Sequence, residues 1–348
     1  MKTIAKWALC AAVLCLNVAW AGAQAGLARE ITFASDGETI PGTLLMPAGA
    51  LPVEGVPVIV LVHGSGPNDR DESIGPNKVF ADLANDLVAH GVATLRYDKR
   101  TYLWKTGKIK FLPGDDLKLT LATEVVDDAV AALAFASTQP GIDRRRIFVL
   151  GHSLGGTMAP RIAAERLKAA AGSVSGVIEL AGAAVPPSAL LPLQIAFQSV
   201  LRGKSLAEAE TQADQASVMF RDAHNPSADL TKRVMFSSAA YLKEWDEVNA
   251  PRTLRALGLP VLVMRGQKDV QVTYQDYVLL AKAATFAGSK AVEFAGLNHL
   301  MMEVAEESTG DEYLRPGHVA SVVADTIAKW IRSIGESGTT QKAESLRE

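Results

Sequence analysis

Apolar positions along the chain form short continuous runs that alternate with stretches of helical spacing. The runs occupy residues 56–64, 92–98, 145–151, 175–182, 259–266 and 291–296. Between them, apolar residues recur every three or four positions over residues 78–91, 122–138, 157–167 and 318–333. A continuous apolar run is typical of a strand that is buried on both faces. The alternation therefore predicts an α/β fold, with a mostly parallel twisted sheet and helices on both of its faces.

Two segments depart from this alternation. Residues 29–47 predict two short strands around an Asp36-Gly37 turn, which is a hairpin signal. Residues 184–257 contain helical patterns and no strand pattern, and they begin at a Pro186-Pro187 stop. We expect this insertion to form a helical cap above the carboxyl ends of the strands. The alternative is a separately packed subdomain that takes no part in binding.

The two ends of the chain carry patterns of their own. Residues 1–25 combine Lys2 and Lys6 with an apolar stretch and small residues up to Ala25, which predicts a cleaved signal peptide. The alternative is an uncleaved membrane anchor, for which the apolar run is short. We expect a periplasmic or secreted protein without a stable membrane anchor after cleavage. The catalytic domain would then span residues 26–335, followed by a polar tail at 336–348 that we expect to be disordered.

Charge and cysteine content limit the partners and the cofactors that the chain can use. The 348 residues carry a formal net charge of -3, which gives no electrostatic case for a nucleic-acid partner. Cys10 and Cys15 both lie inside the predicted signal peptide. Its removal leaves no disulfide, no thiolate nucleophile and no cysteine metal site. No metal or cofactor is expected, and the sequence does not specify an oligomeric state.

Residues 151–155 read Gly-His-Ser-Leu-Gly, between a predicted strand and a predicted helix. In this context a Gly-x-Ser-x-Gly sequence is typical of a sharp turn that exposes a nucleophilic serine. The following helix directs its amino terminus at the site, which favours developing negative charge. The pentapeptide alone is common, and an ordinary glycine-rich turn is the alternative. The strand before it and the helix after it favour Ser153 as a nucleophile.

An acid and a base should then follow Ser153 in the chain, each after a later strand. Asp269 follows the run at 259–266, and His299 follows the run at 291–296. We expect His299 to take the proton of Ser153, and Asp269 to orient the imidazole and stabilise its charged form. Asp98 follows an earlier strand and is the competing acid.

Other residues near these positions receive different assignments. His63 and His152 lie in turns beside the site and are expected to be structural. One oxyanion-hole donor should be the amide of Leu154, directly after the nucleophile. The second should come from the loop after residues 56–64, where Ser65 is favoured over Gly66.

Five short motifs in order resemble a known family. They are HGSGPNDRDE (63–72), GPNK (75–78), LRYDKR (95–100), GHSLGG (151–156) and GLNHL (296–300). Together they are similar to bacterial α/β-hydrolase esterases of the dienelactone-hydrolase and serine-aminopeptidase-like branch, over roughly residues 30–333. The resemblance implies an α/β-hydrolase fold with a cap and a carboxylesterase that prefers short acyl chains and uses no metal or organic cofactor. It places the acid and the base at Asp269 and His299. It also implies ion pairs between residues 69–72 and 98–100, which shape the pocket or support the structure.

Three functions are consistent with these observations. The first is a serine carboxylesterase that acts on small-molecule esters through an acyl-enzyme. The second is a peptidase or amidase with the same triad, which would need an acidic anchor for the substrate ammonium. The insertion offers acids for that role, including Glu208, Glu244 and Asp246. The third is a non-catalytic binding protein, which an intact triad disfavours.

Overall fold

The computed structural model describes residues 26–112, 114–169, 173–225, 227, 229, 233–234 and 237–344. The predicted signal peptide lies outside these residues, so its cleavage stays a prediction. In the part of the chain that is described, no helix combines the length and the apolar character needed to cross a bilayer.

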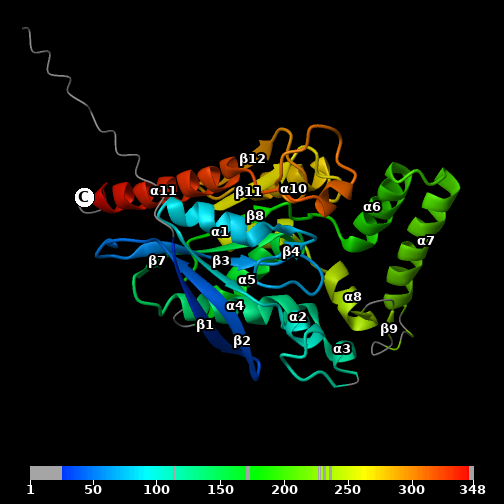
Figure 1. The fold of residues 1–348 in the computed structure, drawn as a ribbon, viewed down its shortest axis with the longest axis horizontal. Helices are drawn as coiled ribbons and strands as arrows, with labels where there is room; N and C mark the ends of the chain where they lie inside the picture. Colours follow the sequence, from blue (N-terminus) through cyan, green and yellow to red (C-terminus); the bar gives the residue numbers. More distant parts are fainter. Residues whose placement is uncertain are drawn as a thin grey trace, which may run out of the picture.

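An eight-stranded sheet forms the centre of the molecule, in the order β1-β2-β6-β3-β7-β8-β11-β12 (Figure 1). The strands are β1 Leu27–Ser35, β2 Glu38–Met46, β3 Val56–Val62, β6 Ala93–Tyr97, β7 Ile142–His152, β8 Gly176–Leu180, β11 Val261–Gly266 and β12 Lys290–Phe294. The six strands from β6 to β12 pair in parallel, whereas β1 pairs antiparallel with β2, and β2 with β6. The prediction of a mostly parallel sheet is confirmed. Parallel order matters for function because it brings the carboxyl ends of these strands to one edge.

The amino-terminal hairpin also follows the prediction. Asp36 and Gly37 join β1 to β2 with φ angles of 46° and 77°. Positive φ at both central residues is the type I′ geometry whose twist matches that of the strands. The hairpin extends the parallel sheet by two antiparallel strands.

Helices cover both faces of the sheet. On one face lie α1 Val79–Ala89 and α11 Ser321–Glu344, and on the other α4 Asp127–Ala136, α5 Leu154–Lys168, α9 Ala250–Leu257 and α10 Tyr274–Ala283. Strand β3 shows how the faces separate: Val58 and Val60 join the cluster under α4 and α5, while Ile59 and Leu61 join the cluster under α1 and α11. This alternation is the period of two that a strand imposes.

The remaining elements are short. They are β4 Ser73–Ile74, β5 Asn77–Lys78, α2 Arg100–Lys105, α3 Asp115–Lys118, the π-helical turn η1 Ala122–Val126, β9 Arg233–Val234, β10 Ser237–Ser238 and the 3₁₀ turn η2 Asp311–Leu314. The pair β9 and β10 lies within the insertion, where only helices were expected. At two residues per strand, neither has the apolar run from which a strand can be predicted.

The insertion between β8 and β11 forms the expected helical layer, with a different boundary. Helices α6 Pro187–Leu201, α7 Leu206–Ala223 and α8 Ala239–Asp246 project beyond the sheet (Figure 1). Phe220, Ala239 and Leu242 form a small apolar cluster between α7 and α8. The predicted end at residue 257 is wrong, because α9 buries Ala250 and Leu254 in the main core. We use the name cap for residues 184–246.

The carboxyl-terminal helix reaches into the predicted tail. Helix α11 continues to Glu344, and the disorder expected over residues 336–348 stays a prediction. An established helix adds one backbone hydrogen bond for each further residue, and residues 336–344 contain no proline to stop it. The first half of α11 is anchored by Trp330, which is buried and donates its indole N–H to the Gly288 carbonyl.

Candidate active site

Ser153 occupies the sharp turn between β7 and α5. Its backbone has φ 55° and ψ -119°, a region that non-glycine residues rarely adopt. The flanking glycines are there because backbone passes close by. A Cβ at Gly151 would lie 2.0 Å from the Gly155 carbonyl oxygen, and one at Gly155 would lie 2.1 Å from the Val62 oxygen. The Ser153 amide donates to the Leu180 carbonyl at 2.9 Å, which ties the turn to β8.

Asp269 and His299 meet after the last two strands. The Nδ1–H of His299 donates to Asp269 Oδ2 at 2.8 Å. The other carboxylate oxygen accepts the amides of Gln271 at 2.8 Å and Val272 at 2.9 Å. Burial alone would raise the pKa of Asp269, but His299 and these amide donors outweigh it and lower the pKa. Asp269 is therefore an ionised, fixed partner that leaves Nε2 as the basic nitrogen of His299.

The loop that carries His299 contacts the residue before Ser153. His152 Nε2 donates to the His299 carbonyl at 2.9 Å, and the two rings lie 4.9 Å apart between centroids. The elbow after β7 and the loop after β12 are thus joined directly. Ser153, Asp269 and His299 all lie at the carboxyl edge of the sheet, as their order in the chain predicts.

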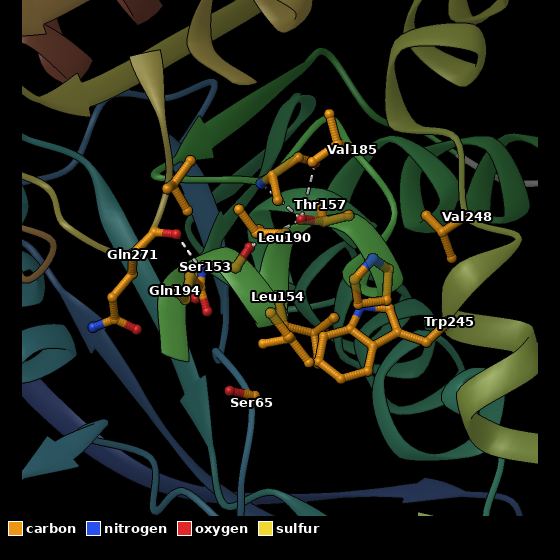
Figure 2. A pocket seen from close by; sticks show the side chains of 14 residues that line it. Ser65, Ser153, Leu154, Thr157, Val185, Leu190, Gln194, Trp245, Val248 and Gln271 are labelled. Carbon is orange, nitrogen blue, oxygen red and sulfur yellow. Dashed lines mark hydrogen bonds between the residues drawn. The ribbon is translucent and has the colours of Figure 1, made fainter. Parts of the chain in front are cut away.

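The loop after β3 faces Ser153 and is held by its carbonyl groups. Ser65, Ser153 and Leu154 line one cleft of about 70 Å³ (Figure 2). Lys99 Nζ donates to the Gly64 and Gly66 carbonyls, both at 3.1 Å. Asn68 donates to the Gly64 carbonyl at 3.2 Å and to that of Ser65 at 3.1 Å. Ser65 and Leu154 thus line the same cleft, and their role as oxyanion donors stays a prediction.

A larger cavity adjoins this cleft under the cap. It measures about 870 Å³ and shares Ser65, Leu191 and Trp245 with the cleft. Its other walls are mostly apolar and include Trp104, Leu119, Ile195, Met219, Tyr241 and Leu242. We call it the cap chamber. Its lining comes from distant parts of the chain, so no local sequence pattern could have identified it.

Two acids, Asp116 and Glu124, line the cap chamber. Glu124 lies in the π-helical turn η1, accepts the Tyr241 hydroxyl at 2.5 Å, and pairs with Lys99 at 3.2 Å. All three side chains are almost fully buried. Since Lys99 also holds the loop after β3, Glu124 connects the chamber wall to that loop. The Glu124 carboxylate is thus ion-paired with Lys99. Lys105 and Asp116 also line the chamber, beside its mostly apolar walls.

A hydrogen bond from the cap reaches the loop of Asp269. The side-chain amide of Gln194, on α6, donates to the carbonyl of Gln271, whose own amide donates to Asp269 (Figure 2). Sequence reasoning missed Gln194, because nothing in a helical pattern indicates which polar side chain will face a distant loop.

The charged motifs beside the cleft pair with one another. Arg70 holds Asp98 through two hydrogen bonds, Nε to Oδ1 at 3.0 Å and NH2 to Oδ2 at 3.1 Å. Arg96 pairs with Asp71, and Arg100 pairs with Asp128. Of the ion pairs expected between residues 69–72 and 98–100, the structure shows one, Arg70 with Asp98. Asp98, the competing acid, is engaged in it and contacts no histidine by hydrogen bond in the described ranges.

The other histidines are also accounted for. His63 packs against Phe80 and Tyr97, and burial lowers its pKa to about 4, so it is neutral. His90, His224 and His318 each face a carboxylate elsewhere, on Asp325, Asp246 and Asp82 respectively. Over the described residues, histidine, cysteine and acidic side chains form no cluster suited to a metal ion.

Comparison with known proteins agrees with this arrangement. The model of the alpha/beta hydrolase family matches residues 59–313. The chain belongs to the α/β hydrolase family. The match includes Ser153, Asp269 and His299, and it excludes the hairpin and the whole of α11.

Individual relatives are esterases. Esterase EstD of Thermotoga maritima is 34% identical over 293 residues, which is 84% of this chain and 65% of EstD. The chain thus spans about two thirds of the length of that relative. Among solved structures, Est1E from Butyrivibrio proteoclasticus has a TM-score of 0.54 at 18% identity and covers 88% of this chain and 98% of its own. The thermostable carboxylesterase EstE1, from a metagenomic library, has a TM-score of 0.54 at 17% identity, over 89% of this chain and 88% of its own. At these identities the structures support the fold.

Proposed function

We propose that the protein is a serine carboxylesterase with Ser153 as nucleophile, His299 as general base and Asp269 as the orienting acid. The observation that carries this proposal is the buried Asp269–His299 hydrogen bond of 2.8 Å, joined through His152 to the strained turn of Ser153. The similarity to esterase EstD supports it.

The reaction proceeds in two halves. Ser153 Oγ attacks the ester carbonyl while His299 Nε2 takes its proton, and the carbonyl oxygen becomes an oxyanion held by the amides of Ser65 and Leu154. The tetrahedral intermediate collapses when the C–O bond to the alcohol breaks and His299 returns the proton to that alcohol. Water then attacks the acyl-Ser153 ester by the same route and releases the acid. Each oxyanion donor is worth about 3 kcal/mol in sites of this type.

The two cavities differ in volume, and this difference predicts which side of the ester carries the larger group. An ester bound through its carbonyl oxygen directs its acyl group and its alkoxy group to opposite sides. The cleft of about 70 Å³ at Ser153 suits a short acyl group, while the cap chamber of about 870 Å³ suits a bulky, uncharged, apolar alcohol. We therefore assign acetate-sized acyl groups to the cleft.

Peptidase activity finds less support. An aminopeptidase needs an unpaired acid for the substrate ammonium, but the three acids of the insertion that were named for this role are each engaged elsewhere. Glu208 forms the capping box of α7, Glu244 pairs with Arg161, and Asp246 pairs with His224. We also propose export by a signal peptide, which amino-terminal sequencing of the secreted or periplasmic protein would test by finding residue 26 first.

The nucleophile is tested with Ser153→Ala on p-nitrophenyl acetate. We expect turnover to vanish while the circular dichroism spectrum and thermal midpoint remain those of the parent. Retained turnover in the folded variant would refute the mechanism. Comparable rates on aminoacyl anilides and on esters would instead favour an amidase.

The cap chamber is tested by filling it. Ala216→Trp adds a ring inside the chamber, whereas Val218→Trp adds the same ring at a position of α7 that is 37% exposed and does not line the chamber. We expect Ala216→Trp to lower kcat/KM for naphthyl acetate but not for ethyl acetate, and Val218→Trp to change neither. A wild-type preference for decanoyl over acetyl esters would reverse the assignment of the two cavities.

A further inference from the structure

Glu72 lies on the loop after β3 and is 1% exposed. Its two carboxylate oxygens face different loops. Oε1 accepts the Gly64 amide at 2.6 Å, directly beside the proposed oxyanion donor Ser65. Oε2 contacts His152 Nδ1 at 3.0 Å, directly beside Ser153.

His152 extends this connection to the third loop of the site. Its Nε2 donates to the backbone carbonyl of His299 at 2.9 Å. The carbonyl can only accept, so Nε2 carries a proton, and Nδ1 carries a second one when the Glu72 carboxylate that faces it is ionised. Burial would lower the pKa of His152, but Glu72 outweighs it and raises that pKa. Burial would raise the pKa of Glu72, but His152 outweighs it and lowers that pKa.

Backbone strain collects at the same loops. Glu72, Ser153 and Met301 are non-glycine residues with positive φ, of 49°, 55° and 59°. Each such residue costs about 1–3 kcal/mol and persists only where its surroundings hold it. Met301 follows His299 by two positions, so all three connected loops contain a strained residue. Hydrogen bonds between these loops are the restraint that such backbones require.

We propose that Glu72 and His152 form a positioning pair that fixes the oxyanion loop, the nucleophile turn and the base loop relative to one another. This inference rests on the proposed esterase function. Neither side chain takes part in proton transfer, since both nitrogens of His152 are already donors to protein acceptors. Their effect is exerted through Ser65, Ser153 and His299. A displacement of about 1 Å in such a constellation can cost about 100-fold in rate.

The first test compares two substitutions of Glu72. Glu72→Ala leaves the Gly64 amide and His152 without their partner, and we expect kcat on p-nitrophenyl acetate to fall about 100-fold while KM changes little. Glu72→Gln can keep every contact. Its oxygen accepts from Gly64, and its NH₂ donates to Nδ1 of a neutral His152 that still donates to the His299 carbonyl. We expect Gln to recover most of the lost kcat.

A matched control separates positioning from stability. Asp143 is 5% exposed and accepts the Arg145 amide and the Arg146 guanidinium at the start of β7. Residues 142–151 run beside the six-residue advance from Val56 to Val62, which places Asp143 about 20 Å from Ser153. Asp143→Ala should lower the thermal midpoint and leave kcat of the folded fraction unchanged. Equal kcat in Glu72→Ala and Asp143→Ala would overturn the proposal, as would a Gln variant no better than Ala.

A second variant covers the case in which Glu72→Ala does not fold. His152→Phe keeps a ring of similar size and removes both hydrogen bonds, so it should also lower kcat about 100-fold. The double variant Glu72→Gln with His152→Phe should lose as much kcat as His152→Phe alone, because the two residues act as one unit. Full activity in His152→Phe would overturn the proposal. If Ser153→Ala retains turnover, the esterase function itself fails, which is a separate result.

Discussion

Two buried imidazole–carboxylate pairs lie side by side in this protein, with ring centroids 4.9 Å apart. His299 with Asp269 and His152 with Glu72 share the same Nδ1 contact, at 2.8 Å and 3.0 Å. They differ at Nε2. In His152 that nitrogen donates to a carbonyl, whereas in His299 it has no acceptor among the described residues. A base needs an unoccupied nitrogen, so the pair nearer to Ser153 in sequence is the structural one.

The largest expected effect separates the two imidazoles. His299→Gln removes the proposed base, and kcat on p-nitrophenyl acetate should fall about 10⁶-fold, as in related triads. His152→Gln disturbs geometry alone, and its loss should be smaller by at least a factor of about 1000. Steady-state kinetics on folded variants make the measurement. Similar losses in both would erase the distinction between base and positioning residue.

The next prediction separates the two acids that compete for the triad. Asp269→Asn should lower kcat about 10⁴-fold, because an amide favours the wrong tautomer of His299. Asp98→Asn breaks the contacts to Arg70 and should lower the thermal midpoint with kcat nearly unchanged. A mild effect of Asp269→Asn with a severe one of Asp98→Asn would transfer the role to Asp98.

A third buried carboxylate, Glu179, differs from Asp269 and Glu72 because no imidazole among the described residues faces it. Glu179 on β8 is fully buried, neither oxygen has a hydrogen-bond partner in the described ranges, and burial raises its pKa well above the ordinary 4.5. A raised pKa gives stability that is complete below the unfolded-state value and is lost as pH rises toward the folded-state value. Glu179→Gln removes this loss, so its advantage over the parent should grow by about 1.4 kcal/mol per pH unit above pH 4.5.

Urea unfolding at several pH values measures the Glu179 effect. The same variant at pH 4 is its own control, because the glutamate is then mostly protonated in both states. A difference that stays constant from pH 4 to pH 8 would mean that Glu179 is ionised in the folded protein.

The smallest effect concerns the charge of the Glu72–His152 pair. The lowered pKa of Glu72 gives stability that is present above its ordinary 4.5 and lost as pH falls through the folded value. The raised pKa of His152 gives stability that is present below its ordinary 6.5 and lost as pH rises through the folded value. The stability of wild type relative to Glu72→Gln should therefore be greatest between pH 4.5 and pH 6.5.

Chemical unfolding of both proteins from pH 4 to pH 9 tests this charge effect. Burial lowers the pKa of His63 to about 4 although Glu72 raises it, so the comparison of the two proteins is made above pH 4, where His63 is neutral in both. A difference that does not vary with pH would show that the pair is uncharged, and that its hydrogen bonds alone connect the loops.

Much of the site could be predicted from short segments of sequence. Gly151 and Gly155 flank Ser153 because only glycine tolerates backbone at 2.0–2.1 Å from a Cβ position, and that requirement is local. Asp269 and His299 each follow an apolar run, and parallel strands place such positions at one edge. The assignment of Ser65 beside Leu154 followed from the same topology. These predictions used patterns within about ten residues.

Other features depend on contacts between distant segments. The Glu72 carboxylate meets His152 across 80 residues, and His152 meets His299 across 147. The helix at 250–257 was placed in the cap by its position in the chain, yet its apolar face packs into the main core. The cap chamber takes its walls from α2, α3, η1, α6, α7 and α8. None of these contacts can be predicted from the spacing of residues along the chain.

Patterns within short segments therefore predicted the order of the main strands and helices, the strained turn of Ser153 and the positions of the proposed acid and base. They could do so because hydrophobic period and glycine placement are properties of neighbouring residues. Tertiary structure alone decided which histidine keeps a free nitrogen, which acids are neutralised and how large a group fits beside Ser153. Those properties depend on where hydrogen-bond partners and apolar walls lie in space, and only the folded chain brings them together.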